Sequence, residues 1–451
     1  MKFLNKQFTQ ETLKLALPVM LTQVGQVSVN LFDNIIVGKL LGAKALAAVS
    51  LGNAMFFSIF IFGLGFSLAI PPLVSEAHSQ HDHNRINSIF RHGFVVNIIL
   101  AFVLMLLIFG IIPLMPYLNQ PKEILPDTIT FLSIVTLSII PFMIFQTMRE
   151  VSEGLSFTIG VTKATIFANV INVILNYVFI EHFKMGVAGS AWATFIARVA
   201  MMVFLYYVLI KEEKTRRYIK DFSLKIKNFT KEMFEKLIRL GFPTALQLFF
   251  EVTAFAGAAF ICGLISAKDI AAHQIALSMA SFTFNLCVGF SVASTVMIGR
   301  KLGEKDFVNL EKVGFNNLKI AFIFMLMCGL VFILGKDVLP TFFTKKEDIA
   351  VVVLSSQLMI IAALFQLSDG IQVTALGCLR GIQDVKIPSI LTFIAYWVIT
   401  IPLGYYLTVP MKMGAFGMWI ALGIGLTISA VLLVIRFRNL SEKRIKAKSN
   451  D

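Results

Sequence analysis

Long apolar segments recur along the whole chain and restrict its possible folds more than any other feature. We count twelve that can cross about 30 Å of hydrocarbon as α-helices. They lie near residues 13–38, 46–73, 90–114, 128–148, 157–180, 187–210, 237–264, 270–298, 314–335, 350–376, 387–409 and 414–435. Only 15% of the residues are charged, against about 25% in soluble globular proteins. The alternation of a membrane β-strand is absent, so we predict an all-α polytopic membrane protein.

Lysines and arginines gather in the loops on one side of these predicted helices. With an even number of spans that side holds both termini, and the positive-inside rule makes it cytoplasmic. The N-terminal segment lacks the compact apolar region and cleavage site of a signal peptide, so we expect no removed leader. Because the basic residues lie in short loops between apolar segments, the net charge of +14 does not indicate a nucleic-acid partner.

The two halves of the sequence resemble each other. "LGAKALAAVS" at 41–50 returns as "ISAKDIAAHQ" at 265–274, a separation of 224 residues. "MGVAGSAWA" at 185–193 returns as "MGAFGMWIA" at 413–421, a separation of 228 residues. Matches in the same order at nearly the same separation indicate an internal duplication.

We therefore predict two lobes of six transmembrane helices each, residues 1–210 and 237–451, related by a pseudo-two-fold axis along the membrane normal. A basic cytoplasmic loop at 211–236 joins them. Parallel repeats of this kind are typical of transporters that work by alternating access. A duplicated bundle with only a structural role is the alternative.

Three carboxylates, Asp33, Glu251 and Asp369, lie inside apolar segments. An acidic residue at a helix centre in a bilayer costs roughly 2.5–3.5 kcal/mol. Polar residues at helical spacing share a face with each acid or line the fifth span; they are Gln26, Asn30, Thr244, Gln247, Gln366, Gln372, Asn169, Asn172 and Asn176. These faces predict an internal wet cavity, because polar groups that meet lipid lack partners.

The basic residues within the predicted spans, Arg198 and Lys319, are too few to neutralise three acids. Such carboxylates are suited to take up H⁺ or Na⁺ and to attract an organic cation. Hydrogen bonding to neighbouring helices alone is the structural alternative. Pro18 and Pro243 lie in the first span of each lobe, where proline bends a helix; the bend is linked either to ion binding or to packing alone.

No other motif for chemistry is evident. The histidines of "EAHSQHDHNRIN" (76–87) fit a solvated turn better than a metal site, and His273 fits a hydrogen-bonded bundle histidine better than a second titrating group. A phosphate-binding loop and the common hydrolase motifs are absent. We expect no enzymatic activity, no cofactor, and no metal other than a possible coupling Na⁺.

The sequence resembles the MATE (multidrug and toxic compound extrusion) family, and its NorM-like branch in particular. The resemblance covers essentially the whole chain. It rests on "LALPVMLTQVGQVSVNLFDNIIVGKLLGAKALAAVSLG", "REVSEGLSFTIGVTKA", "FPTALQLFFEVTAF", "AAHQIALS" and "QLSDGIQVTALGCLRGIQDVKIP", in this order. The resemblance implies two six-helix lobes and the export of bulky, often cationic or amphipathic compounds in exchange for Na⁺ or H⁺.

The resemblance also implies roles for particular residues. Asp33 is similar to the N-lobe acid of the family, and its partners in a cation site are Asn172, Asn176 and Thr194. Some relatives carry an aspartate in place of Asn176, so this site has one negative charge fewer.

In the C-lobe, Glu251 and Asp369 resemble the acids of the NorM-like branch, with Gln247 beside Glu251. Phe365 stands where relatives carry a tyrosine, and its ring offers a cation a π face but no hydroxyl. Pro18 matches a proline that bends the first helix in some relatives.

From these features we expect a multidrug antiporter, probably inadequate as an enzyme, in a bacterial-type inner membrane. Its partners would be the lipid bilayer and small cationic or amphipathic substrates, and we expect a monomer. Three alternatives stay open: a flippase for lipid-linked precursors, a cation-coupled symporter, and an intramembrane enzyme. A flippase would need more basic residues in its spans to hold an anionic headgroup, and an enzyme would need a nucleophile–base pair or a metal site.

Overall fold

The described part of the chain is built from helices. The computed structural model describes residues 4–117, 121–225, 228–343 and 349–449, and these ranges contain no β-strand. Within them, eleven helical segments are long and apolar enough to cross a membrane. The pair α5 (Leu125–Leu137) and α6 (Ile139–Gly154) is bent by 42° and makes a twelfth span if it is counted as one. The predicted all-α membrane fold is confirmed.

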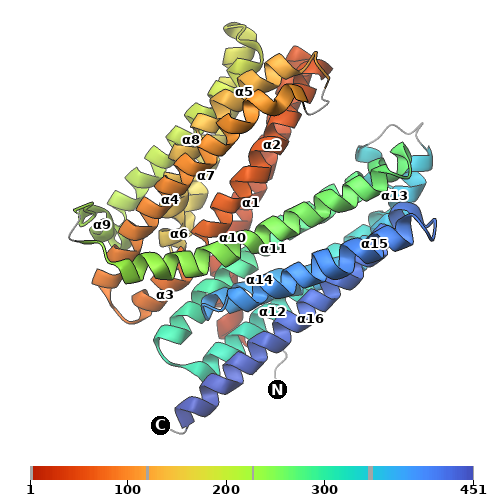
Figure 1. The fold of residues 1–451 in the computed structure, drawn as a ribbon. Helices are drawn as coiled ribbons and strands as arrows, with labels where there is room; N and C mark the ends of the chain where they lie inside the picture. Colours follow the sequence, from red (N-terminus) through yellow and green to blue (C-terminus); the bar gives the residue numbers. More distant parts are fainter. Residues whose placement is uncertain (1–3, 118–120, 226–227, 344–348, 450–451) are drawn as a thin grey trace. The chain divides into compact units, whose positions relative to one another are not determined.

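The chain forms two compact units (Figure 1). We call Leu21–Ala245 the N-terminal unit, and Met1–Met20 with Leu246–Asp451 the C-terminal unit. The helices up to the middle of the chain are α1 (Lys6–Leu41), α2 (Ala43–Ser67), α3 (Ile70–Ser79), α4 (His83–Ile111), η1 (Ile112–Tyr117), α5, α6, α7 (Ile159–Tyr177), η2 (Val178–His182), α8 (Gly186–Lys211) and α9 (Glu213–Lys220). Those that follow are α10 (Lys231–Gly263), α11 (Ala267–Gly303), α12 (Phe307–Gly335), η4 (Leu339–Phe342), α13 (Ile349–Gly381), α14 (Lys386–Phe393), η5 (Ile394–Thr400), α15 (Ile401–Thr408) and α16 (Gly414–Ser449).

The chain passes from one unit to the other inside two helices, α1 and α10. The passage in α1 follows Met20 and the passage in α10 follows Ala245, so each lies just beyond a proline inside the helix, Pro18 or Pro243. The unit boundaries therefore differ from the predicted lobe boundaries in the first twenty residues and in 211–245.

Polar bonds fix the first part of α1 in the C-terminal unit. The Thr12 hydroxyl donates to Asn317 Oδ1 at 2.6 Å, and Arg300 Nη1 lies 2.7 Å from Glu11 Oε1. Thr12 and Asn317 are buried, where a lost partner is costly. These bonds explain why the chain's first residues pack with its second half.

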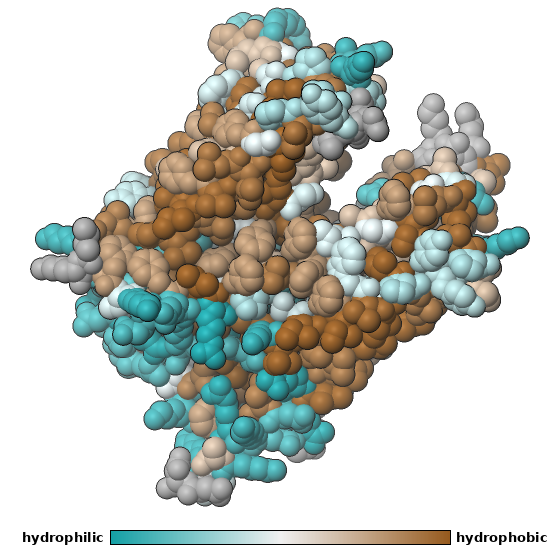
Figure 2. All heavy atoms as spheres, in the orientation of Figure 1, coloured by the Kyte–Doolittle hydropathy of each residue, from teal (hydrophilic) through white to brown (hydrophobic). Residues whose placement is uncertain are grey.

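Hydroxyl groups join the central helices of the C-terminal unit. Ser291 and Thr295 on α11 donate to the carbonyl oxygens of Val373 and Gly377 on α13, at 2.7 and 3.0 Å. Close approach of this kind needs small residues at the contact, and a Cβ on Gly377 would collide with Ser291. Large apolar side chains instead cover the outer surfaces, as Figure 2 shows; Leu106 and Phe260, for example, are 66% and 70% exposed.

The internal duplication is visible in the backbone. Turn residues with positive φ recur at the same separations as the sequence matches: His81 (56°) and Lys305 (54°), and Lys184 (53°) and Lys412 (58°). Asp82 and Asp306, which follow the first pair, cap α4 and α12 through backbone N–H groups. The turns and caps of the first half are therefore repeated in the second.

The basic loop after α8 is partly helical and packs on the N-terminal unit. Its helix α9 buries Thr215 and Tyr218, and the Tyr218 hydroxyl lies 2.8 Å from His83 Nδ1. Burial raises the pKa of Tyr218, although the nearby Arg217 charge opposes this. Phe222 then packs between Phe90 and Phe94, with ring centroids 4.9 and 5.2 Å away.

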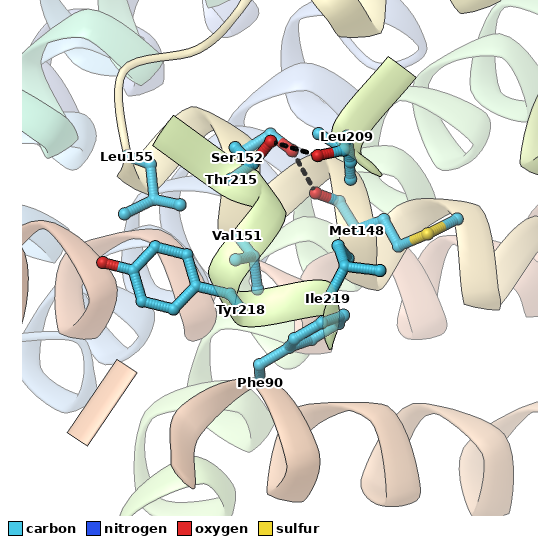
Figure 3. Close-up of a pocket in the computed structure, with 9 residues that line it drawn as sticks. All are labelled: Phe90, Met148, Val151, Ser152, Leu155, Leu209, Thr215, Tyr218 and Ile219. Atoms are coloured by element: carbon cyan, nitrogen blue, oxygen red, sulfur yellow. Dashed lines mark hydrogen bonds between the residues drawn. The ribbon is translucent and has the colours of Figure 1, made fainter. Parts of the chain in front are cut away.

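A small cavity lies beneath α9 (Figure 3). Its lining comes from α4, α6, α8 and α9 and consists of Phe90, Met148, Val151, Ser152, Leu155, Leu209, Thr215, Tyr218 and Ile219. The volume is about 10 Å³, which is close to the minimum for a single water molecule. The cavity is therefore a packing defect and too small for an organic substrate.

Candidate cation sites

The acid of the N-terminal unit has an amide partner. Asn176 Nδ2 on α7 donates to Asp33 Oδ1 on α1 at 2.6 Å and lies 3.3 Å from Asn172 Oδ1. Asn172 and Asn176 are buried and Asp33 is half-buried. The two asparagines lie four residues apart and share one face of α7. The structure thus brings together three of the four residues predicted for this site.

Thr194 is the fourth residue predicted for the N-terminal site. Its hydroxyl donates to the Ser190 carbonyl oxygen at 3.1 Å, within its own helix α8. Among the described residues it makes no hydrogen bond to Asp33. Thr194 is half-buried, and its part in cation binding stays a prediction.

An arginine lies near Asp33, which the residue counts alone do not predict. The charges of Arg198 and Asp33 act on each other. The Arg198 guanidinium nevertheless donates to Ser138 Oγ at 2.7 Å and lies 4.8 Å from the centre of the Phe56 ring. The described residues contain no Asp33–Arg198 ion pair within 4.0 Å. Asp33 therefore feels a positive charge without being locked to it.

The C-terminal unit holds two acids in one buried region. Glu251 on α10 is 7% exposed and Asp369 on α13 is 3% exposed. Their charges act on each other, and the charge of Arg380 acts on Glu251. Among the described residues, neither acid forms a salt bridge within 4.0 Å to a lysine or arginine. Two like charges in one low-dielectric region repel each other, so this region favours a neutralising cation.

A tyrosine joins the two helices that carry these acids. The Tyr396 hydroxyl donates to Gln372 Oε1 at 3.0 Å and lies within hydrogen-bonding reach of Glu251. Tyr396 comes from η5, a π-helical segment, and is fully buried. The sequence analysis did not find this residue because it searched for acids and amides, whereas Tyr396 stands in the aromatic run "FIAYWVI" (393–399). A search for every hydroxyl inside an apolar segment would have included it.

The other predicted residues of this site lie beside the acids. Gln247 on α10 is 2% exposed, and its Nε2 has no hydrogen-bond partner in the described part of the structure. Phe365 is also buried, and its ring centroid lies 5.5 Å from Trp419 and 6.2 Å from Phe255. Phe365 thus belongs to an aromatic cluster of the unit, and its contact with a cation stays a prediction.

His273 differs from the hydrogen-bonded bundle histidine that the sequence favours. It is fully buried, and neither ring nitrogen has a hydrogen-bond partner among the described residues. Its ring centroid lies 6.0 Å from Trp419. Sequence spacing cannot show whether a buried ring finds a partner on another helix.

Buried charges on α6 are a further feature that the sequence analysis missed. Arg149 Nε lies 2.7 Å from Glu153 Oε1, and Gln146 Nε2 lies 2.5 Å from Glu150 Oε1. All four side chains are buried. The sequence analysis placed the span near 128–148 and so left these residues outside it. The described residues contain no group of three or more possible metal ligands.

The family model MatE matches the chain twice, at residues 18–178 and 243–406. Among the relatives, "Probable multidrug resistance protein NorM" of Agrobacterium fabrum is 33% identical over 96% of this chain and 94% of its own length. "Multidrug resistance protein NorM" of Photobacterium profundum is 31% identical, with 95% of each chain covered. "Multidrug resistance protein MdtK" of Pectobacterium atrosepticum is 31% identical, with 97% of each covered.

Solved structures share the fold. The structure described as "Outward-facing conformation of a multidrug resistance MATE family transporter of the MOP superfamily" superposes with a TM-score of 0.88 at 20% identity. It covers 97% of this chain and 96% of its own. The eukaryotic MATE transporter AtDTX14 superposes with a TM-score of 0.87 at 17% identity and covers 98% of this chain and 99% of its own. With the family model matched once in each half, this chain belongs to the MATE family of membrane transporters.

Proposed function

We propose that this chain is a secondary-active antiporter that exports cationic or amphipathic organic compounds in exchange for Na⁺ or H⁺. The observation that carries the proposal is the buried acid pair Glu251 and Asp369, which has no salt-bridge partner within 4.0 Å among the described residues. The names of the relatives, multidrug resistance proteins NorM and MdtK, support the substrate class.

In the proposed cycle the coupling cation binds at the C-terminal acids. When both carboxylates are ionised, their repulsion in a buried region raises the free energy of the empty site. A proton or Na⁺ relieves this repulsion, so binding of the cation is favoured whenever the site is open to water. Gln247, Gln372 and Tyr396 supply the neutral polar groups around the ion.

The N-terminal acid has a different part in this cycle. Asp33 already accepts a hydrogen bond from Asn176 and feels the charge of Arg198. Its negative charge is therefore partly compensated before any cation arrives. We propose that Asp33 with Asn172, Asn176 and Thr194 forms a secondary site, which adjusts transport without setting the coupling.

Exchange follows if the cation and the substrate each weaken the binding of the other. Thermodynamic linkage makes the two effects equal in size. The passages of the chain between units lie just beyond Pro18 and Pro243, where the missing backbone hydrogen bond makes a helix easier to bend. We propose these two positions as the bending points of alternating access.

The remaining features of the proposal follow from composition and family. The protein lies in the inner membrane of a bacterial-type cell with both termini in the cytoplasm, works as a monomer within the lipid bilayer, and uses neither a cofactor nor ATP. The flippase alternative is disfavoured because the buried Arg149 is already paired with Glu153 and is not available for an anionic headgroup. The transporter family disfavours the enzyme alternative.

Transport by the purified protein in proteoliposomes tests this function. A fluorescent organic cation is loaded, and Na⁺ and pH gradients are imposed separately. We expect one gradient to drive the dye against its own concentration gradient, in the direction opposite to the cation. Movement of dye and cation in the same direction would identify a symporter, and absence of movement under both gradients would contradict the proposal.

A further inference from the structure

The buried hydroxyl of Tyr396 has only one proton to donate. In the structure that proton goes to Gln372 Oε1, at 3.0 Å. The hydroxyl also lies within hydrogen-bonding reach of Glu251. The Tyr396 side chain is fully buried and packs in the aromatic cluster with Phe255, 5.9 Å between ring centroids. Its hydroxyl must therefore find its partners within the unit.

This arrangement suits a Glu251 that carries a cation. With the Tyr396 proton committed to Gln372, only the lone pairs of the hydroxyl oxygen are left to face Glu251. Those lone pairs accept a hydrogen bond from a protonated carboxyl group or contribute to a bound Na⁺. They repel an ionised carboxylate without a cation.

Gln372 holds a group that the opposite arrangement uses. Its amide is 1% exposed, yet Nε2 has no hydrogen-bond partner in the described part of the structure. A buried donor without an acceptor is costly. If the amide turns over, Nε2 donates to the Tyr396 oxygen, and the Tyr396 proton is released to donate to the ionised Glu251. Both states then satisfy the hydroxyl, but with opposite directions of donation.

We propose that Tyr396 and Gln372 form a hydrogen-bond switch whose direction is set by whether Glu251 holds a cation. The inference rests on the proposed antiport function. Because Gln372 lies three residues from Asp369 on α13, a change in its amide reaches the second acid and the helix that carries it. Tyr396 and Gln372 are positioning residues in this account: they transmit the cation state of Glu251 from α10 to α13.

Other charged and titratable groups face these residues from each neighbouring helix. Asp369 and Arg380 lie on α13 and act on Glu251. Cys287 on α11 lies within range of Asp369. All of them stay in place when Tyr396 or Gln372 is substituted, so the variants below remove only the link between the two helices.

The test compares substrate binding with and without the coupling cation in Tyr396→Phe and Gln372→Leu. The matched control is Tyr405→Phe, which removes a hydroxyl from a tyrosine of α15 that is 49% exposed. The dissociation constant of a fluorescent organic cation is measured on purified full-length protein, first at high pH without Na⁺ and then at saturating coupling cation. The factor between the two values is the linkage.

We expect both variants to keep the cation-free dissociation constant within about twofold and to reduce the linkage factor at least about fivefold, within the usual range of coupling between sites. Tyr405→Phe keeps the full factor. An unchanged factor in either well-folded variant overturns the switch. If one variant does not fold, the other decides alone.

An infrared difference spectrum on addition of the coupling cation gives a second readout. We expect the bands of a tyrosine and of a glutamine amide to change in the unaltered protein, and both changes to disappear in Tyr396→Phe. Amide changes that persist in Tyr396→Phe overturn the switch. If the unaltered protein itself shows no linkage and no transport, the proposed antiport fails, and this result is distinct from a failure of the switch alone.

Discussion

The acids of the two units sit in different surroundings although the units arose by duplication. Asp33 is half-buried, accepts a hydrogen bond from Asn176 and feels the charge of Arg198. Glu251 and Asp369 are buried together, and their nearest hydrogen-bonding side chains are neutral. One site is compensated by its own residues and the other is not.

The repeat also shows that the acids did not arise from a common site. Pro18 and Pro243 are 225 residues apart, and at that separation Glu251 corresponds to Gln26 and Asp33 corresponds to Ala258. The duplication preserved turns, caps and helix order, whereas the charges were placed independently in each half. The comparison teaches that the duplicated scaffold does not by itself define the ion site, and that the uncompensated site is the one that needs a cation.

Removal of both C-terminal acids should have the largest effect on transport. We expect Glu251→Gln with Asp369→Asn to reduce cation-driven efflux by about 100-fold, since a coupling factor between two sites is typically of that order at most. Efflux from proteoliposomes measures it. Glu235→Gln is the matched control, because Glu235 lies on the same helix in an exposed ion pair with Lys231. Full efflux by the double variant would show that these acids are dispensable.

A second carboxylate in the N-terminal site should make it resemble the C-terminal site. We expect Asn176→Asp to add a cation dependence to substrate binding and to strengthen cation binding about tenfold, because two neighbouring carboxylates favour a shared positive partner. Titration of substrate affinity against Na⁺ or pH measures the change. Asn172→Asp is the informative comparison, since Asn172 has no hydrogen bond to Asp33 among the described residues. An Asn176→Asp variant that behaves as the unaltered protein would contradict the comparison.

Loss of the arginine near Asp33 should act in the same direction but more weakly. We expect Arg198→Gln to strengthen cation binding at Asp33 by about fivefold, because a charge interaction without direct contact is worth roughly 1 kcal/mol. The Asp33→Asn, Arg198→Gln double variant should lose this gain. If Arg198→Gln weakens cation binding instead, the proposed compensation is wrong.

The repeated helix caps predict a small effect on stability that is similar in the two units. Alanine at an N-cap costs about 1 kcal/mol, so Asp82→Ala and Asp306→Ala should each lower the thermal stability of the purified protein slightly. Asparagine at either position should keep the cap and serves as the control. Equal stability of the alanine and asparagine variants would contradict a capping role.

Acid should remove the contribution of one cap. Partial burial opposes the shift, but hydrogen bonds from Asn309 and the Lys301 charge lower the pKa of Asp306. A lowered pKa in the folded state stabilises the protein above the unfolded pKa, and this stability is lost as pH falls through the folded value. The difference between the unaltered protein and Asp306→Ala should therefore shrink in strong acid. A difference that grows on acidification would contradict this sign.

The sequence alone was sufficient for the helical fold, the duplication and the three intramembrane acids. Each of these depends on local composition or on a repeat, and the structure brings Asp33, Asn172 and Asn176 together as expected. It was not sufficient for the exchange of helix ends between units, because that depends on distant contacts such as Thr12 with Asn317. Tyr396 and Arg198 were missed as site residues for the same reason: their roles come from neighbours on other helices and not from their own spacing.

The most direct test of the account is the release of cations when substrate binds. An organic cation is added to the purified protein in detergent, and the protons or Na⁺ ions that leave each molecule are counted for the unaltered chain, for Asp33→Asn and for Glu251→Gln with Asp369→Asn. The account predicts release by the first two and none by the double variant. Undiminished release by the double variant would contradict the claim that the uncompensated acids of the C-terminal unit hold the coupling ion.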